Sequence, residues 1–387
     1  MASPPLDWKL ALSASERYEN IQAIKALLEN NGMTSSDTQR NAFTIESEAY
    51  KNSSSKEQYD SVCKSISQEN SHETHIELGE ALPAPVSNSP GVTIGSYRNC
   101  HHIAGGVTSE VYRSETTALK VIVETRNIEP HNPLREVKIL TSLKKPCIIS
   151  LIESFRDQEQ RLVLAFPYMP TGLDALIERG ALSRSYIIKH FKDLFMALDY
   201  IHSRGIIHRD IKPSAVLLAS PDGPAVLSDF GTSWHPELSA YTEPANQKIL
   251  DIGTGPYRSP EALFGDHSYG PAVDMWAAGA MLAECCRVPS KTLFESRAAH
   301  EDGNQLGLIL SIFKTIGSPT RESWPEALNY RTPPFDIYQT FEGNAWNEIL
   351  SRVDSDFREA IESLIKYSAS RRPSAAQILQ SSCFTAE

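Results

Sequence analysis

The sequence lacks long apolar runs, extended basic runs and paired cysteine spacings. No apolar run approaches the roughly 20 residues needed to cross a bilayer, so we expect no membrane-spanning helix and no membrane partner. No basic run exceeds two residues and the net charge is −11, which argues against a nucleic-acid partner because such affinity rests on clustered Lys and Arg. The acidic N-terminal segment also lacks the pattern of a signal peptide.

The six cysteines are scattered through apolar contexts and show no spacing typical of a metal site. Reduced, buried thiols are the expected state, as is typical of an intracellular protein. The sequence shows no targeting signal that would distinguish the nucleus from the cytoplasm, so we expect the protein in either compartment or in both. With 387 residues, of which 41% are hydrophobic and 22% charged, the chain is long enough for two or three globular domains.

The most informative stretch lies in the middle of the chain. A His-Arg-Asp tripeptide ends at Asp210, Lys212 follows two residues later, and an Asp-Phe-Gly tripeptide begins at Asp229. Apolar residues at 206–207, 216–218 and 226–227 predict short buried strands that fix these turns. Together the motifs resemble the catalytic loop and metal-binding turn of eukaryotic protein kinases, whose patterns are H-R-D-x-K-x-x-N and D-F-G.

The resemblance implies an enzyme that binds ATP and Mg²⁺ and transfers the γ-phosphoryl group to a protein hydroxyl. Such a reaction depends on positioning and charge neutralisation more than on covalent chemistry. By this resemblance Asp210 accepts the proton of the attacking hydroxyl, Lys212 contacts the transferring phosphoryl group, and Asp229 is the metal ligand. A lysine at 212 also favours serine and threonine over tyrosine as acceptors.

The expected nucleotide site begins at residues 104–112, which resemble the family's glycine-rich loop but keep only its middle glycine, Gly106. Lys120 is expected to hold the α and β phosphates, and Glu136, sixteen residues later, to pair with it from the front helix of the small lobe. Residues 161–169 predict a buried strand that leads into the adenine-binding hinge. The expected nucleotide-contacting residues are Ala104, Gly105, Gly106, Val111, Ala118, Lys120, Phe166, Pro167, Met169 and Asp229.

The activation segment is predicted to run from Asp229 to Glu261. The family's activating threonine is replaced by Ile249, so hydrophobic packing, or Asp251 in place of a phosphate, is expected to order this segment. Thr254 is expected to bridge the catalytic carboxylate and lysine, and Glu261 to pair with Arg372. The expected catalytic residues are therefore Asp210, Lys212, Lys120, Glu136 and Thr254.

Two features select a subfamily within this resemblance. Tyr-Arg before Pro-Glu at 257–261 and the segment 293–325 are similar to the cyclin-dependent kinase group. The divergent fungal kinases that activate cyclin-dependent kinases are the most similar, so a cyclin-dependent kinase is one expected substrate. Residues 130–133 replace the usual cyclin-contacting sequence, which leaves cyclin dependence open.

One departure from the family pattern bears on activity. Ala215 stands where the family has the asparagine that ligates a second metal, and a methyl group coordinates nothing. Losing one electrostatic contact at a reaction centre costs about 3–4 kcal/mol, or two to three decades in rate. The alternative function is therefore a pseudokinase scaffold that binds proteins, although the other main chemical groups are present and favour an enzyme.

The resemblance predicts an α+β, bilobal protein kinase fold over residues 96–384, with a small β-rich lobe and a large helical lobe. A linker is expected at 71–95 because Ser, Asn, Pro and Glu dominate there. Residues 1–70 predict three short amphipathic helices, the third capped by Ser54. This bundle is weakly similar to the KIX-like domain of fungal Mediator subunits, which implies a helical peptide partner; a generic helical extension is the alternative.

Overall fold

The computed structural model describes residues 24, 49, 53, 55–65, 90–106, 108–123, 129–180, 182–296, 304–335 and 339–385. The chain divides into two compact units, Met1–Ser87 and Asn88–Glu387. No helix within these described ranges is both long enough and apolar enough to cross a membrane.

In the first unit, α4 (Lys56–Ser65) corresponds to the third predicted helix. Its cap is Ser55, whose hydroxyl accepts a hydrogen bond from the Gln58 backbone N–H at 3.3 Å. The sequence analysis placed the cap one residue earlier, at Ser54, because both serines fit the same spacing pattern. The first two predicted helices lie outside the described residues except for Ile24 and Ala49, so the three-helix bundle stays a prediction.

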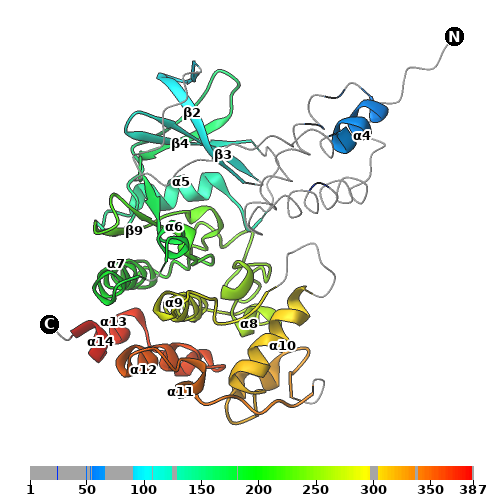
Figure 1. Ribbon diagram of the computed structural model, residues 1–387, viewed down its shortest axis with the longest axis vertical. Helices are drawn as coiled ribbons and strands as arrows, with labels where there is room; N and C mark the ends of the chain where they lie inside the picture. The colour runs from blue at the N-terminus through cyan, green and yellow to red at the C-terminus, as the bar shows by residue number, and fades with distance from the viewer. Residues whose placement is uncertain are drawn as a thin grey trace. The chain divides into compact units, whose positions relative to one another are not determined.

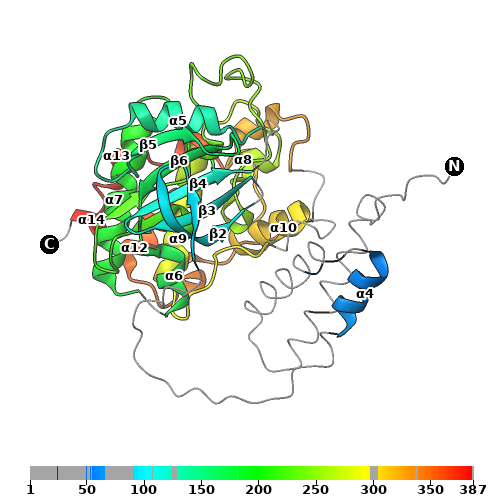
Figure 2. The ribbon, with the colours of Figure 1, turned by 90° about the horizontal axis from the view of Figure 1, so that it is seen from above.

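The second unit begins with a six-stranded antiparallel sheet whose order is β1-β2-β3-β4-β6-β5 (Figure 2). One helix, α5 (Pro133–Ser142), accompanies this sheet. The strand β1 lies within the range assigned to a linker, so the sheet begins before the predicted domain boundary at residue 96. The strands are β1 (Val92–Ile94), β2 (Tyr97–Gly105), β3 (Ser109–Ser114), β4 (Thr117–Ile122), β5 (Glu153–Arg156) and β6 (Leu162–Pro167).

Alternation along β4 decides which side chains enter the core of the small lobe. Leu119 and Val121 are fully buried, and their neighbours in the strand point to the opposite face. On that opposite face, the register pairs Lys120 with Val111 of β3 and Leu164 of β6. The strand pairing thus gathers on one face four residues that the sequence assigned to the nucleotide: Val111, Ala118, Lys120 and Phe166.

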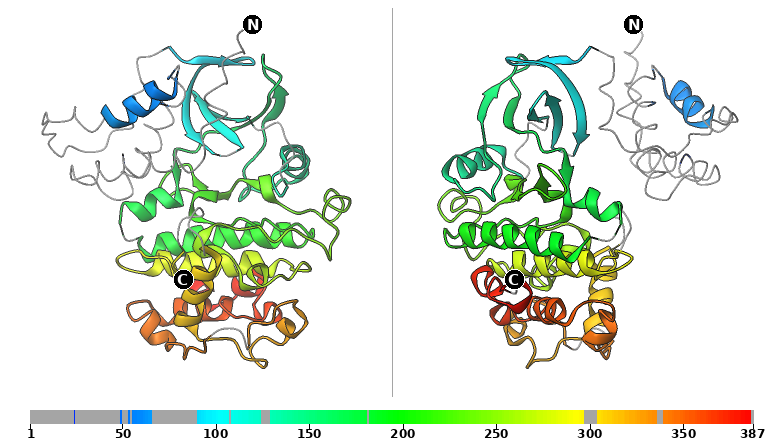
Figure 3. Two further views of the ribbon diagram at one scale, coloured as in Figure 1. Left: turned by 90° about the vertical axis from the view of Figure 1, so that its right-hand side faces the viewer. Right: turned by 60° about the vertical axis from the view of Figure 1, so that its left-hand side comes forward.

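The large lobe is built from helices packed around α9 (Ala272–Cys286), which is buried from Val273 to Cys285 and lies at its centre (Figures 1 and 3). A helix buried on every side belongs to the core of a large domain. The predicted helix at 185–203 is confirmed as α7 (Arg184–His202). The remaining helices include α6 (Leu173–Glu178), α8 (Pro260–Leu263), α10 (Asn304–Ile316), α11 (Trp346–Ile349), α12 (Ser355–Leu364), α13 (Ala375–Ile378) and α14 (Ser382–Thr385).

A small sheet connects the catalytic loop (residues 208–215) to the Asp229 turn (residues 229–231). Its strands are β7 (Thr171–Gly172), β8 (Val216–Leu218) and β9 (Ala225–Leu227), in that order. The antiparallel pairing of Val216 with Leu227 brings the loop before β8 beside the turn after β9. The predicted strands at 216–218 and 226–227 are confirmed, whereas Ile207 forms only a single bridge with Trp234.

Candidate active site

The catalytic loop is held by one buried carboxylate of α9. Asp274 accepts hydrogen bonds from the backbone N–H groups of His208 and Arg209, both at 2.8 Å, and contacts the His202 ring at 2.9 Å. Burial by itself raises the pKa of the Asp274 carboxyl, but these hydrogen bonds and the nearby histidines outweigh it and lower that pKa. The loop backbone is therefore fixed by a charged group in the core of the large lobe.

Three predicted catalytic residues meet at the end of this loop. The Thr254 hydroxyl donates a hydrogen bond to Asp210 Oδ1 at 2.6 Å. Lys212 Nζ lies 2.5 Å from Asp210 Oδ2 and 3.2 Å from Thr254 Oγ1. The expected bridge by Thr254 is thus present, and it orients a carboxylate that has a cation on its other side.

Lys120 joins the small lobe to the Asp229 turn. Its Nζ lies 2.9 Å from both carboxylate oxygens of Glu136 on α5 and 3.0 Å from Asp229 Oδ1. Burial opposes the charged form of Lys120, but the charges of Asp229 and Glu136 outweigh it and raise its pKa. The charge of Lys120 in turn lowers the pKa of Asp229, so the aspartate is ionised at neutral pH.

The Asp229 turn has an unusual backbone that depends on its neighbours. Asp229 has φ 60° and ψ 63°, a left-handed conformation that is costly for most residues other than glycine. The adjacent Phe230 is fully buried, with its ring edge-on to His208 at a centroid distance of 4.9 Å. The Asn132 N–H donates to the Gly231 carbonyl at 2.9 Å. Contacts from both lobes therefore hold the turn in this conformation.

The residues predicted to bind adenine and the phosphates lie at the two ends of the small-lobe sheet. The tip of the β2–β3 hairpin is closed by a hydrogen bond from the Gly106 N–H to the Ser109 carbonyl at 2.8 Å. Ala104 pairs with Val111 across this hairpin, and Gly105 pairs with Glu110. At the other end, Phe166 and Met169 pack partly buried against the large-lobe core. Pro167 ends β6 between them.

The donor groups fit one Mg²⁺ ion better than two. Asp229 has a side chain that is 48% exposed and ionised, and Mg²⁺ is held by one or two carboxylates together with phosphate and water oxygens. Ala215 is buried, and its carbonyl already accepts hydrogen bonds from the backbone and hydroxyl of Ser228 at 2.8 and 2.9 Å. Position 215 therefore offers no ligand for a second ion.

The activation segment is ordered by a residue that the sequence analysis missed. Glu243 forms a bidentate ion pair with Arg209, and both side chains are fully buried. Asp251, expected in place of a phosphate, is 85% exposed and pairs with Arg258 at 3.2 Å instead. The expectation for Asp251 was wrong because it assumed an acidic residue next to Ile249. The carboxylate that binds Arg209 belongs to Glu243, which lies nearer the start of the segment.

The end of the segment is anchored as expected. Arg372 donates to both carboxylate oxygens of Glu261 at 2.6 and 2.8 Å, in the core of the large lobe. Arg372 also donates to the Ala272 carbonyl at 2.8 Å, which connects this ion pair to the start of α9. A buried bidentate pair fixes both position and orientation.

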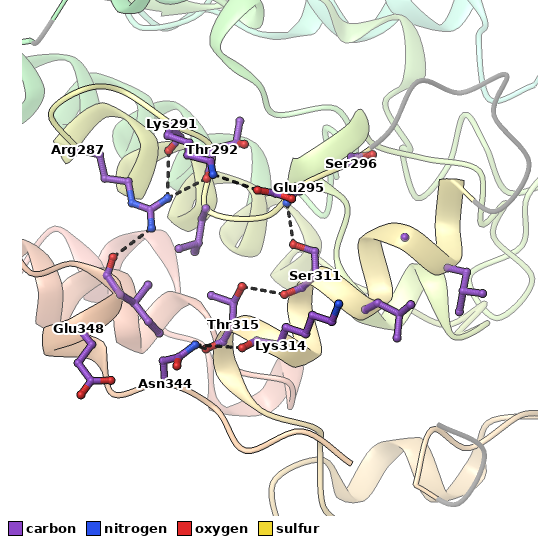
Figure 4. Close-up of a pocket in the computed structure, with 15 residues that line it drawn as sticks. Arg287, Lys291, Thr292, Glu295, Ser296, Ser311, Lys314, Thr315, Asn344 and Glu348 are labelled. Carbon is purple, nitrogen blue, oxygen red and sulfur yellow. Dashed lines mark hydrogen bonds and ion pairs between the residues drawn. The ribbon is translucent and has the colours of Figure 1, made fainter. Parts of the chain in front are cut away.

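A pocket of about 1000 Å³ lies elsewhere in the large lobe, and none of the expected site residues lines it (Figure 4). Its polar groups largely bind one another: Arg287 donates to the Thr292 carbonyl at 2.8 Å, and Ser311 accepts from the Glu295 N–H at 2.8 Å. Within the described residues, no cluster of His, Cys, Asp and Glu that could hold a metal ion is found. The expected catalytic side chains lie around Asp210 and Asp229 and not in this pocket.

Comparisons with known proteins agree with this geometry. The protein kinase domain family matches residues 97–384. The serine/threonine-protein kinase csk1 of Schizosaccharomyces pombe is 33% identical over 288 residues, which cover 70% of this chain and 90% of csk1. Cyclin-dependent kinase 7 of Carassius auratus is 30% identical over 307 residues, covering 75% and 83% of the two chains.

A third relative, the CTD kinase subunit alpha of Saccharomyces cerevisiae, is 29% identical over 307 residues, which cover 75% of this chain and 55% of that protein. These matches favour the enzyme and give no support to the alternative of a scaffold without catalysis. The chain therefore belongs to the protein kinase family and is a serine/threonine protein kinase of the cyclin-dependent kinase group.

Proposed function

We propose that this kinase uses Asp210 as the base, with Lys212, Lys120 and Asp229 surrounding the phosphates of ATP. The observation that carries the proposal is the position of Lys120, which contacts Glu136 and Asp229 at 2.9 and 3.0 Å and so connects the nucleotide-facing sheet to the large lobe. In this arrangement the charged groups are oriented before the substrate binds. Preorganised charges of this kind supply most of the catalysis in phosphoryl transfer.

The proposed reaction is a direct displacement at the γ-phosphorus. The substrate hydroxyl oxygen forms a bond to phosphorus, its proton passes to Asp210, and the bond between phosphorus and the β–γ bridging oxygen breaks to release ADP. Asp229 would hold Mg²⁺, which would neutralise charge on the phosphate oxygens. Lys212, which now contacts Asp210, can turn to the transferring phosphoryl group, while the Thr254 hydroxyl keeps the Asp210 carboxylate oriented.

Ala104, Gly105, Gly106, Val111 and Ala118 are proposed to cover the nucleotide, and Phe166, Pro167 and Met169 to line its adenine end. The shared sheet face of Val111 and Ala118 supports this assignment. Pro167 has no N–H but still offers a carbonyl acceptor.

The proposed substrate is the activation-loop threonine of a cyclin-dependent kinase. Similarity to csk1 and to cyclin-dependent kinase 7 supports it. The ion pair between Glu243 and Arg209 also supports it, because an upstream activator needs an ordered activation segment without an activator of its own. We place its action in the nucleus or the cytoplasm. For the N-terminal unit, a helical peptide remains the proposed partner.

The test is phosphate transfer from ATP by the full chain to a panel of protein substrates that includes a cyclin-dependent kinase. Asp229→Asn is the matched control, since it removes the metal ligand while keeping nearly the same shape. We expect transfer to the loop threonine of the cyclin-dependent kinase and its loss in the control. Transfer to other substrates only would reject the proposed substrate. No transfer by a chain that still binds ATP and Mg²⁺ would reject the proposed catalytic roles.

A further inference from the structure

His131 lies in a short turn that leads into α5 and is held rigid by its own neighbours. The Asn132 side chain donates to Glu129 at 3.1 Å and caps α5 by accepting from the Arg135 N–H at 2.9 Å. Arg135 in turn donates to the Pro130 carbonyl at 2.6 Å and pairs with Glu129 at 3.0 Å. This turn is therefore fixed on both sides of His131.

The same turn is attached to the centre of the candidate active site. The hydrogen bond from the Asn132 N–H to the Gly231 carbonyl ties the residue after His131 to the Asp229 turn. Gly231 lies directly against the charged cluster: a side-chain carbon there would lie 3.4 Å from Glu136 Oε2 and 3.5 Å from Lys120 Nζ. His131 is thus next in sequence to Asn132, which contacts Gly231 beside the charged side chains of Lys120 and Glu136.

The His131 ring is exposed and makes no hydrogen bond within the described part of the chain. Partial desolvation lowers the pKa of His131, with the charges of Asp229 and Asp210 opposing this and those of Lys120 and Lys212 adding to it. These four charges belong to the side chains around the Asp229 turn, beside which the Asn132–Gly231 hydrogen bond places the turn that carries His131. At neutral pH the imidazole is uncharged, so one ring nitrogen is a hydrogen-bond donor and the other an acceptor.

We propose that His131 is a further residue of the phosphoryl-transfer site, and that its ring N–H donates a hydrogen bond to an oxygen of the transferring phosphoryl group. This inference rests on the proposed roles of Asp210, Lys212 and Asp229, because the transferring group must lie between those three side chains. The His131 ring is an exposed donor of this turn, whereas the side chains of Glu129, Asn132 and Arg135 are held by contacts with one another.

The proposal also accounts for the methyl group at Ala215. Without a ligand for a second metal ion, less positive charge surrounds the phosphate oxygens in the transition state. A histidine donor approaching from the small lobe offsets part of that deficit, because a hydrogen bond to a charged oxygen is stronger than a neutral one. In this proposal the hydrogen-bond donor at His131 compensates for part of the charge that is lost because Ala215 cannot bind a second metal ion.

The first experiment compares His131→Ala with wild type in the full chain, measuring kcat and KM for ATP and for the protein substrate. We expect kcat to fall about tenfold to a hundredfold while KM for ATP changes by less than about threefold, since the interaction strengthens in the transition state. His131→Gln keeps an N–H donor and should recover part of kcat. Lys138→Ala, an exposed change on the same helix, should leave kcat unchanged.

The outcomes separate this inference from the proposed function. A wild-type chain without any transfer would reject the catalytic roles themselves. An active wild type with an equally active, folded His131→Ala variant would overturn the role of His131 and leave the proposed function standing. If His131→Ala fails to fold, as judged by thermal unfolding, a folded His131→Phe, which fills similar space without an N–H, takes its place. A kcat of His131→Phe at least about tenfold below that of His131→Gln supports the donor, whereas wild-type kcat in His131→Phe overturns it.

A second experiment tests the link to Ala215. Ala215→Asn restores the missing amide, and we expect it to raise kcat more in the His131→Ala background than in the wild-type background. Equal factors in the two backgrounds would show that the residues act independently and would overturn the link.

Discussion

Both carboxylate oxygens of Glu243 accept hydrogen bonds from Arg209, the residue immediately before Asp210, and both side chains are fully buried. Arg209 also donates to the Thr232 carbonyl at 2.5 Å and to the Tyr269 hydroxyl at 3.2 Å. Tyr269 donates onward to the Ile249 carbonyl at 2.7 Å. One arginine therefore connects the start and the middle of the activation segment to the catalytic loop, and the carboxylate that neutralises this arginine belongs to the same chain.

Replacing Glu243 with alanine should unfold the activation segment and abolish most activity. The change leaves the Arg209 guanidinium buried without its counter-charge, and breaking a buried pair in this way costs about 3–5 kcal/mol. We expect a loss of that size in the free energy of unfolding, measured by urea denaturation, together with a fall in kcat of at least about tenfold. Asp251→Asn is the matched control, and it should change neither quantity because the Asp251 side chain is 85% exposed.

The same ion pair predicts an activity that needs no phosphate on the activation segment. Treatment of the purified kinase with a phosphatase should leave kcat within about twofold of its starting value, because Glu243 already neutralises Arg209. Mass spectrometry before and after treatment would verify that any phosphate had been removed. A large loss of activity on dephosphorylation would mean that the carboxylate does not replace a phosphate.

Thr254→Val should lower kcat with little effect on stability. Valine has the same shape, but it removes the hydroxyl that donates to Asp210 at 2.6 Å and contacts Lys212 at 3.2 Å. Losing a hydrogen bond to a charged group of the reaction centre corresponds to about tenfold to a hundredfold in rate. Thr254→Ser keeps the hydroxyl and should retain most of kcat. Equal rates for valine and serine at this position would contradict the role of the bridge.

Much of the candidate site could be predicted from sequence because its chemistry is carried by short motifs. Asp210 and Lys212 belong to one turn, and the alternation along β4 fixes the face on which Lys120 lies. Thr254 and Glu261 lie at set distances from recognisable dipeptides. Each motif is short enough to be recognised by its resemblance to protein kinases, and that resemblance also supplied contacts between motifs that spacing alone does not give, such as the one from Thr254 to Asp210, 44 residues away.

Glu243 could not be found in this way. Its partner Arg209 is separated from it by 34 residues, and the intervening chain has no periodicity that predicts where it turns back. The sequence analysis considered Asp251 and not Glu243, and only the packing around Arg209 separates these two acidic residues. His131 is a similar case, because its position depends on a backbone contact between Asn132 and Gly231 that no side-chain pattern encodes.

Asp274→Asn should destabilise the kinase from the core of the large lobe. The carboxylate accepts from two backbone N–H groups, of His208 and Arg209, and from the His202 ring. An amide cannot accept at both of its atoms, so at least one of these N–H groups would lose its partner inside the protein. We expect a loss of about 3 kcal/mol in the free energy of unfolding by urea denaturation.

Asp199→Asn, an exposed change on the neighbouring helix α7, is the control and should stay within about 0.5 kcal/mol of wild type. The catalytic rate of Asp274→Asn should fall as well, because the loop that carries Asp210 loses its fixed backbone. A variant with normal stability and a normal rate would show that the loop does not depend on this carboxylate.

Lys120→Met should remove most of the catalytic activity and also lower the free energy of unfolding. It removes the cation that joins Glu136 to Asp229, and Glu136 is then buried without a partner. We expect kcat to fall by two to three decades, the usual cost of one electrostatic contact at a reaction centre. Lys120→Arg keeps the charge, but a planar guanidinium cannot place one nitrogen between both carboxylates, so it should also be strongly impaired.

The pH dependence of the wild type provides an independent check on Lys120. The two carboxylates raise its pKa, and a group of this kind gives its full stabilising contribution below its unfolded-state pKa, about 10.4, and loses it only as the pH rises through the higher folded-state value. The free energy of unfolding should therefore show no loss due to Lys120 between about pH 7 and 9. A loss in that range that is present in wild type and absent from Lys120→Met would mean that the lysine titrates early and that the ion pair is weak.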